Sequence, residues 1–273
     1  MSVDSPHTTV DKLGVEWAAL AELAATFTEA QWKTPTECPG WTVQDNLSHI
    51  IGTERMLAGL GRTSHQAPEA PWVHNPIGRS NEDDVDERRA RSGAEVYQEF
   101  LDITQARLSF LRSATPEDFA VPMTTPTGPG TMASFLHIRV MDNWIHEQDI
   151  RRALDLPGHL TGPVPEHSID RLWTAWPMVI GKRAGATAGQ SVTVTLDGPV
   201  HRFGTVVIGE RAGWGELDAS QTATAGITMD SEAFIIAVTG RRLAADLVET
   251  NRIRFVGDSA LAQRAVDSLN IMI

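Results

Sequence analysis

A segment rich in proline and glycine, PGHLTGPVPEHS at residues 157–168, divides the chain into two parts of different character. Clustered Pro and Gly resist both helix and strand. Before this segment apolar residues recur at helical spacing, and after it short runs alternate as strands do. Since 273 residues exceed the usual size of one domain, we predict two domains, residues 1–156 and 157–273. The segregation of helical and strand runs favours the α+β class.

The first part is predicted to be a four-helix bundle. Apolar spacing and capping residues place the helices at roughly residues 10–27, 43–59, 94–111 and 132–154. Each of them carries an apolar face, and such faces bury one another in a bundle. Residues 62–92 are rich in Pro, Gly, Asn and acids and are predicted to be a long loop, which in a compact domain is often functional.

The second part is predicted to combine helices with an antiparallel sheet. A helix is expected at about residues 169–181. The runs SVTVTLDGP, HRFGTVVIGE and TATAGITMD alternate and are punctuated by turn residues, so they are predicted to be strands. The runs SEAFIIAVTG and SALAQRAVDSL are predicted to close the domain as helices.

Composition excludes several function classes. The net charge of -12 argues against a nucleic-acid partner, which needs a basic face. The N-terminal residues lack the pattern of a secretory signal, and no apolar run approaches the length of a membrane span, so we expect a cytoplasmic protein without a membrane partner. A single cysteine, Cys38, excludes a cysteine-rich zinc site. Any metal must therefore be held by histidine and carboxylate.

Asp142 and His146 stand one helical turn apart in MDNWIHEQDIRR, and His49 lies in an earlier predicted helix. Helical neighbours at this spacing share a face, so the pair can hold one metal ion. A buried salt bridge between Asp142 and Arg139 is the alternative explanation. By periodicity alone, His49 would be a histidine at the edge of the helix's apolar face.

Other polar residues are candidates for supporting roles. Arg88 and Arg89, predicted to open the third long helix, could bind a substrate carboxylate through paired hydrogen bonds. A charge run of this kind is more often a solvated face. Asp149 is a better candidate than Glu147 to orient a ligating imidazole, because of the direction in which it faces on the predicted helix. His137 is expected to be a packed or surface residue.

Two blocks carry a family resemblance: TECPGWTVQDNLSHIIGTE, residues 36–54, and FLHIRVMDNWIHEQDIRRALDLPG, residues 135–158. Together they resemble the mycothiol-dependent maleylpyruvate isomerase family, which belongs to the DinB-like metal-binding bundles. The segment from about residue 160 is similar to the sterol-carrier-like domain often attached to this bundle. The resemblance implies a divalent metal, usually zinc, bound by His49, Asp142 and His146. Several members have glutamate where this chain has Asp142.

The resemblance implies an enzyme whose metal activates a small thiol, mycothiol, against a small electrophile. The reaction would be isomerisation of maleylpyruvate or S-transfer, and the metal site serves both equally. The alternative is a non-catalytic ligand-binding or stress-response protein with a structural metal site. Three protein ligands favour catalysis, because a structural zinc normally has four.

Overall fold

The structure is a computed structural model that describes residues 4–272. It divides into two compact units, one ending at His159 and the other spanning Leu160–Met272. The division falls inside the Pro/Gly-rich segment 157–168, close to the predicted boundary after residue 156. Within the described residues, every helix is too short or too polar to cross a membrane.

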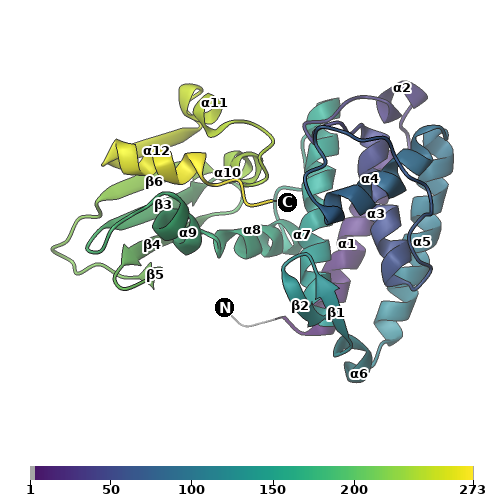
Figure 1. The fold of residues 1–273 in the computed structure, drawn as a ribbon, viewed down its shortest axis with the longest axis horizontal. Coiled ribbons are helices and arrows are strands. Elements are labelled where there is room, and N and C mark those ends of the chain that lie inside the picture. The colour runs from purple at the N-terminus through teal and green to yellow at the C-terminus, as the bar shows by residue number, and fades with distance from the viewer. Residues whose placement is uncertain (1–3, 273) are drawn as a thin grey trace. The chain divides into compact units, whose positions relative to one another are not determined.

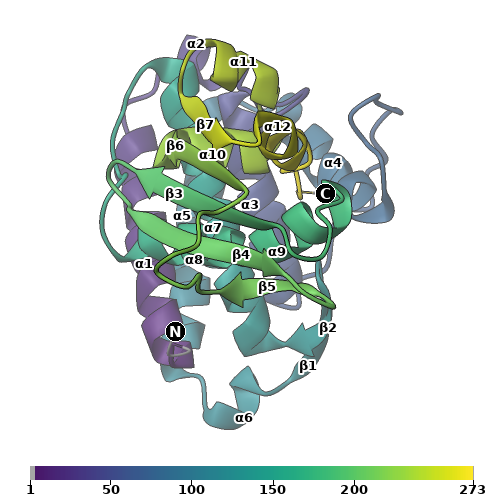
Figure 2. The same ribbon diagram turned by 90° about the vertical axis from the view of Figure 1, so that its left-hand side faces the viewer.

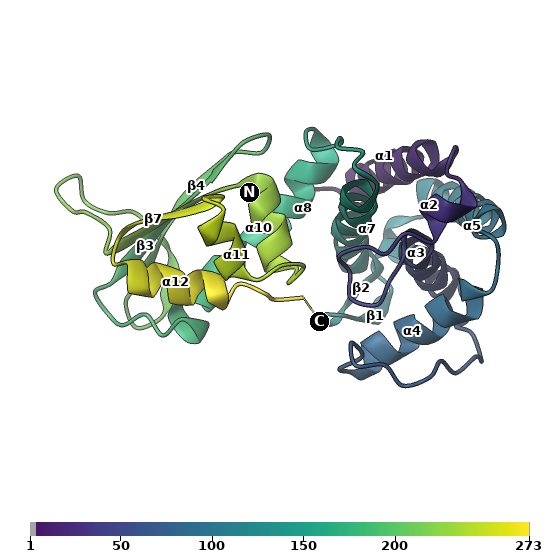
Figure 3. The same cartoon turned by 90° about the horizontal axis from the view of Figure 1, so that it is seen from above.

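Four long helices form the first unit, as predicted (Figure 1). They are α1 (Pro6–Ala24), α3 (Val43–Leu57), α5 (Gly93–Ser113) and α7 (Met132–Leu154). Both α1 and α3 pack against α5 and α7, so the four helices close into a ring around one core (Figure 3). Fully buried apolar side chains from all four fill that core, among them Leu13, Leu47, Phe100 and Leu136.

Local capping chemistry sets where the two site-bearing helices begin. Thr42 accepts a hydrogen bond from the backbone of Asp45, whose carboxylate accepts one in return, which is the predicted capping box of α3. Thr131 and Ser134 form the same arrangement at the start of α7. These caps fix the phase of each helix, and therefore the face on which its polar residues lie.

The prediction of a loop throughout residues 62–92 is wrong, because helix α4 (Pro76–Arg89) occupies much of this segment and packs against α3. Asn75 caps the helix and Pro76 occupies its first turn. Its buried face is mostly charged, so apolar spacing does not reveal it; the buried residues are Glu82, Asp84, Val85 and Arg88. Arg88 and Arg89 therefore end α4 and do not open the following long helix.

Smaller elements complete the first unit. A hairpin of β1 (Pro122–Thr125) and β2 (Gly128–Thr131) precedes α7. The short helices α2 (Glu29–Trp32) and α6 (Pro116–Phe119) lie in the connections between the long helices.

The second unit contains a five-stranded sheet with the order β5-β4-β3-β6-β7 (Figure 2). The strands are β3 (Ser191–Asp197), β4 (Arg202–Ile208), β5 (Ala212–Gly215), β6 (Ala225–Asp230) and β7 (Ile253–Gly257). The prediction of a wholly antiparallel sheet is wrong, since β3 and β6 pair in parallel. Alternation identifies a strand and its buried face, but it does not identify the strand's neighbours.

Helices pack against this sheet, with α9, α10 and α12 in contact with its strands. The helical elements are α8 (Pro163–Trp173), α9 (Trp176–Met178), the π-helical turn η1 (Val179–Arg183), α10 (Ser231–Val238), α11 (Ala244–Glu249) and α12 (Ser259–Asp267). Helix α8 begins inside the Pro/Gly-rich segment 157–168, because proline is tolerated in a first helical turn. The mixture of helices and sheet confirms the α+β class.

Candidate metal centre

Three predicted ligand residues lie together where α3 and α7 pack: His49, Asp142 and His146. Each offers one donor atom, and the three atoms lie within 4.8 Å of one another. His49 Nε2 is 3.1 Å from one oxygen of Asp142, and His146 Nε2 is 3.8 Å from the other. Both imidazoles are buried. The helical spacing of the α7 pair and the close packing of α3 thus bring together the three residues that the family resemblance implies as ligands.

The protonation states of the cluster suit metal binding. Burial lowers the pKa of His49 to about 4, which leaves a neutral imidazole at physiological pH. Burial alone would raise the pKa of Asp142, but the charge of Arg139, together with the hydrogen bond to His49, holds it well below its usual value. A neutral imidazole and an ionised carboxylate are the forms that bind a metal ion.

The His146 ring is oriented by hydrogen bonding on its Nδ1 side. Asn46 Oδ1 lies 2.7 Å from Nδ1, and a carboxylate oxygen of Asp149 lies 3.5 Å away. An amide oxygen can only accept, so Nδ1 carries the proton and the Nε2 lone pair faces Asp142. Glu147 instead pairs with Arg151. The geometry thus agrees with the preference for Asp149, while Asn46, one helical turn before His49, was missed.

Trp41 covers both imidazoles of the cluster. Its ring centroid is 5.3 Å from that of His49 and 5.6 Å from that of His146. Glu82, buried on α4, accepts hydrogen bonds from the indole nitrogens of Trp41 and Trp72. Periodicity cannot identify Trp41, because it lies in the turn that precedes α3.

The salt bridge between Asp142 and Arg139, which is the alternative explanation to metal binding, is present in the structure together with the cluster. Arg139 is 2% exposed and also pairs with Glu54, which in turn binds Arg107. One oxygen of Asp142 contacts both Arg139 and His49, whereas the other faces His146. The carboxylate can therefore keep its arginine partner and still offer an oxygen to an ion.

The donor set fits a divalent metal ion. Two imidazoles and one carboxylate are ligands that zinc and other first-row divalent ions accept. Nε2 of His49 and Nε2 of His146 both face the carboxylate of Asp142, so the three side chains present donor atoms to one place. The use of these three residues as ligands stays a prediction that the geometry supports.

The two predicted catalytic arginines have different surroundings. Arg88 is buried, and Glu99 binds both its Nε and its Nη2 atoms. Arg89 is more open, with 31% of its side chain exposed, and it pairs with Glu82 and Asp86. Through Glu82, Arg89 is linked to Trp41 and so to the covered imidazoles. A catalytic role for either arginine stays a prediction.

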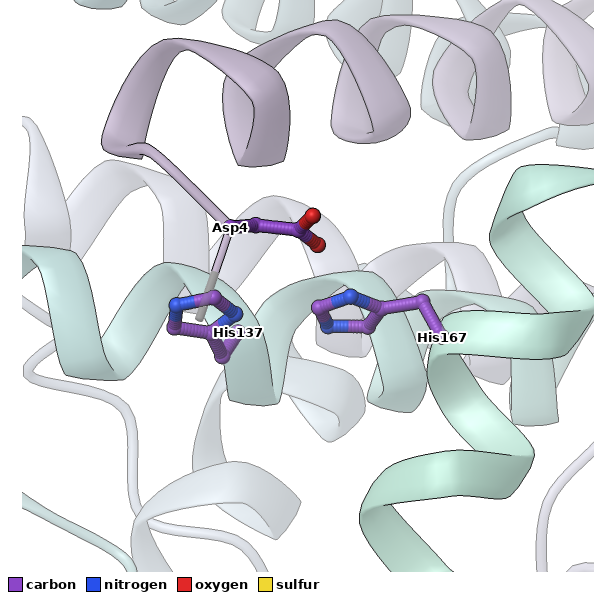
Figure 4. Close-up of side chains that lie close together, drawn as sticks. All are labelled: Asp4, His137 and His167. Carbon is purple, nitrogen blue, oxygen red and sulfur yellow. The ribbon is translucent and has the colours of Figure 1, made fainter. Parts of the chain in front are cut away.

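Cys38 and His137 lie outside the group of His49, Asp142 and His146. Cys38 is buried, and its sulfur belongs to a group of possible donors with His146 and Asp149. Since Asp149 faces Nδ1 of His146, this group lies on the opposite side of the ring from Asp142. Figure 4 shows His137 on α7. His137 is not a member of the group of His49, Asp142 and His146.

Without metal, the protein is expected to lose stability as the pH falls from about 6.5 to about 4. The unfolded chain protonates His49 near its ordinary pKa of about 6.5, whereas the folded protein protonates it only near 4. The unfolded state therefore binds more protons in this window, and acid favours it by up to about 3 kcal/mol. Urea unfolding in chelator at several pH values measures the effect. His49→Gln should flatten the profile, and an unchanged slope would contradict the assignment.

Comparison with known proteins agrees with this architecture. Two proteins of Mycobacterium tuberculosis, "Uncharacterized protein Rv0036c" of strain H37Rv and "Uncharacterized protein MT0041" of strain CDC 1551, are each 27% identical over 253 residues, covering 89% of this chain and 88% of theirs. The fold resembles crystal structures of the mycothiol-dependent maleylpyruvate isomerase. One, of a point mutant, has a TM-score of 0.56 at 14% identity and covers 93% of this chain and 95% of that one.

A second crystal structure of that isomerase has a TM-score of 0.52 at 15% identity, covering 89% of this chain and 93% of its own. The family model described as "Mycothiol maleylpyruvate isomerase N-terminal domain" matches residues 13–151. The match spans the bundle, including every residue of the His49, Asp142 and His146 cluster. The chain therefore belongs to the mycothiol-dependent maleylpyruvate isomerase family.

Proposed function

We propose that this protein is a metal-dependent enzyme that activates mycothiol for isomerisation of, or S-transfer to, a small electrophile. The observation that carries the proposal is the cluster of His49, Asp142 and His146, whose donor atoms lie within 4.8 Å of one another. This group has three members among the described residues. A structural zinc normally takes four protein ligands, whereas a catalytic zinc keeps one position open. The geometry therefore supports catalysis over a purely structural metal.

The charges around the cluster suit the handling of a thiol. His49 and His146 would contribute no charge as neutral ligands, and the single charge of Asp142 is shared with Arg139. A divalent ion held there would supply a positive charge that lowers the pKa of a thiol and favours its thiolate. Trp41 packs over both imidazoles and keeps water from that side of them.

Two reactions of a thiolate are compatible with this site. In isomerisation, the sulfur adds to a cis carbon–carbon double bond, the resulting single bond rotates, and the sulfur leaves as the trans double bond forms. The thiol is then regenerated unchanged. In S-transfer, the sulfur displaces a leaving group, which departs with the bonding electron pair, and the sulfur stays attached to the product. Mycothiol and maleylpyruvate are proposed here because the similar crystal structures are named for them.

Arg89 is the better of the two arginines to hold a substrate carboxylate. Its guanidinium is partly exposed, so it can exchange one of its present partners for an incoming anion. Arg88 is buried and already bound at two nitrogens by Glu99. We propose that Arg89 contacts substrate, and that Arg88 stabilises the end of α4 against α5.

Metal analysis and mass spectrometry would test the function together. The purified protein is expected to hold a divalent ion and, with mycothiol, to convert maleylpyruvate or another small electrophile. A conjugate that accumulates would indicate S-transfer, whereas a trans product with mycothiol unchanged would indicate isomerisation. Protein without divalent metal, even after reconstitution, would overturn the proposal. Turnover with another thiol but none with mycothiol would overturn the choice of cofactor.

A further inference from the structure

A second cluster of possible metal ligands lies elsewhere in the bundle unit. Glu16 of α1, Glu147 of α7 and His159 each offer one donor atom, and these atoms lie within 4.8 Å of one another. His159 Nδ1 is 2.6 Å from Glu147 Oε2 and 3.6 Å from Glu16 Oε2. Successive residues of an α-helix point about 100° apart. Glu147 therefore leaves α7 in a different direction from its neighbour His146.

Glu16 pairs with His159 at 3.6 Å, which is beyond hydrogen-bond distance. It is completely buried, and neither carboxylate oxygen has a hydrogen-bond partner within residues 4–272. Glu147 is also completely buried, but Arg151 binds one of its oxygens and His159 the other. Two buried carboxylates thus share one arginine. A buried carboxylate is costly unless it is paired or coordinated to a metal, and here two of them are held together beside Arg151 and the imidazole of His159.

The backbone holds the third donor in place. His159 has φ 51°, in the left-handed region that residues other than glycine seldom adopt. Its carbonyl oxygen accepts a hydrogen bond from the indole nitrogen of Trp144 at 2.9 Å. The carbonyl of the preceding residue, Gly158, accepts one from the side chain of Gln148. Contacts with α7 therefore maintain an uncommon conformation that directs the imidazole at the two carboxylates.

We propose that Glu16, Glu147 and His159 bind a second divalent transition-metal ion. One imidazole with two carboxylates suits ions such as Zn²⁺ and Mn²⁺. Glu147 would bind through Oε2 while Arg151 keeps Oε1, which is the kind of outer partner that orients a ligating carboxylate. With 15% of its side chain exposed, His159 marks where the ion can enter. The ion would tie α1 to the C-terminal end of α7.

A proton is the competing occupant of this cluster. Burial, followed by the nearby charge of Glu147, raises the pKa of Glu16. In metal-free protein, the two carboxylates could therefore share one proton. Glu16→Gln separates the two possibilities, because a glutamine amide can still donate to Glu147 as a protonated carboxyl does, but it is a poor ligand for a divalent ion.

The test is the metal stoichiometry of the full-length protein after reconstitution with excess Zn²⁺, or separately Mn²⁺, and removal of free ion. Wild type is expected to hold two equivalents, and His49→Ala and Glu16→Gln one each. The ion should raise the Tm of His49→Ala but not that of the double variant. Should Glu16→Gln fail to fold, His159→Gln must show the same loss of one equivalent.

Equal metal content in wild type and Glu16→Gln would overturn the second site and leave the shared proton as the explanation. Loss of all metal in His49→Ala would overturn it as well. The proposed function is tested by His49→Ala, and it fails if this variant holds as much metal as wild type. The two proposals therefore fail by different results.

Discussion

Replacement of His146 by alanine is expected to abolish stable metal binding at the candidate centre, and with it the activation of the thiol. The substitution removes one of three protein ligands, and the site has no fourth member within the described residues to take its place. Loss of a residue that only orients a ligand typically costs about 10- to 100-fold in affinity. Loss of the ligand itself should cost more than that.

A graded set of variants makes this expectation specific. Metal affinity is measured in the Glu16→Gln background, so that the second cluster does not contribute. Asn46→Ala, which removes the acceptor from His146 Nδ1, should weaken binding by about 10- to 100-fold. His137→Ala, on the same helix, should leave affinity unchanged. Equal losses in the His146 and His137 variants would show that the face of α7 has been assigned wrongly.

The bundle could be predicted because its helices carry their information locally. The capping pair Thr42 and Asp45 and the repeating apolar residues of α3, α5 and α7 are properties of neighbouring positions in the chain. Helix α4 could not be predicted in the same way, because its buried face is mostly charged. Burial of Glu82 and Arg88 depends on partners in other segments, such as Trp41 and Glu99.

The candidate site also combines residues that local sequence predicts with residues whose roles depend on distant segments. The spacing of Asp142 and His146 on one helix face is local, and the family resemblance joined His49 to them. Asn46 and Trp41 could not be predicted from local sequence, because their roles arise from contacts across the bundle. The parallel pairing of β3 with β6 is likewise a long-range choice that alternation within each strand does not specify.

The same long-range character marks the ion pairs beneath the candidate centre. Glu54 on α3 is completely buried and pairs with Arg107 of α5 and Arg139 of α7. Arg139 in turn contacts Asp142, so Glu54 is linked to the metal cluster through Arg139. Two arginines facing Glu54 and Asp142 make a group with balanced charge, and such a group is stable in the interior only while every member keeps its partner.

Glu54→Ala is therefore expected to destabilise the protein by about 3–5 kcal/mol. The substitution removes the carboxylate that pairs with Arg107 and leaves Arg139 with Asp142. Without Glu54, Arg139 would also pair more strongly with the carboxylate of Asp142, which would weaken metal binding. Urea unfolding of the metal-free protein measures the first effect, and metal titration the second. Glu22→Ala, an exposed substitution on α1, should change stability by less than about 0.5 kcal/mol.

A loss in Glu54→Ala no larger than in Glu22→Ala would mean that water reaches the two arginines once the carboxylate is gone. Loss of stability with unchanged metal affinity would instead separate the ion-pair group from the candidate centre. Arg139 would then act only as packing between α3 and α7. The expected combination, a less stable bundle that also binds metal more weakly, requires the charge of Arg139 to be divided between Glu54 and Asp142, as their contacts indicate.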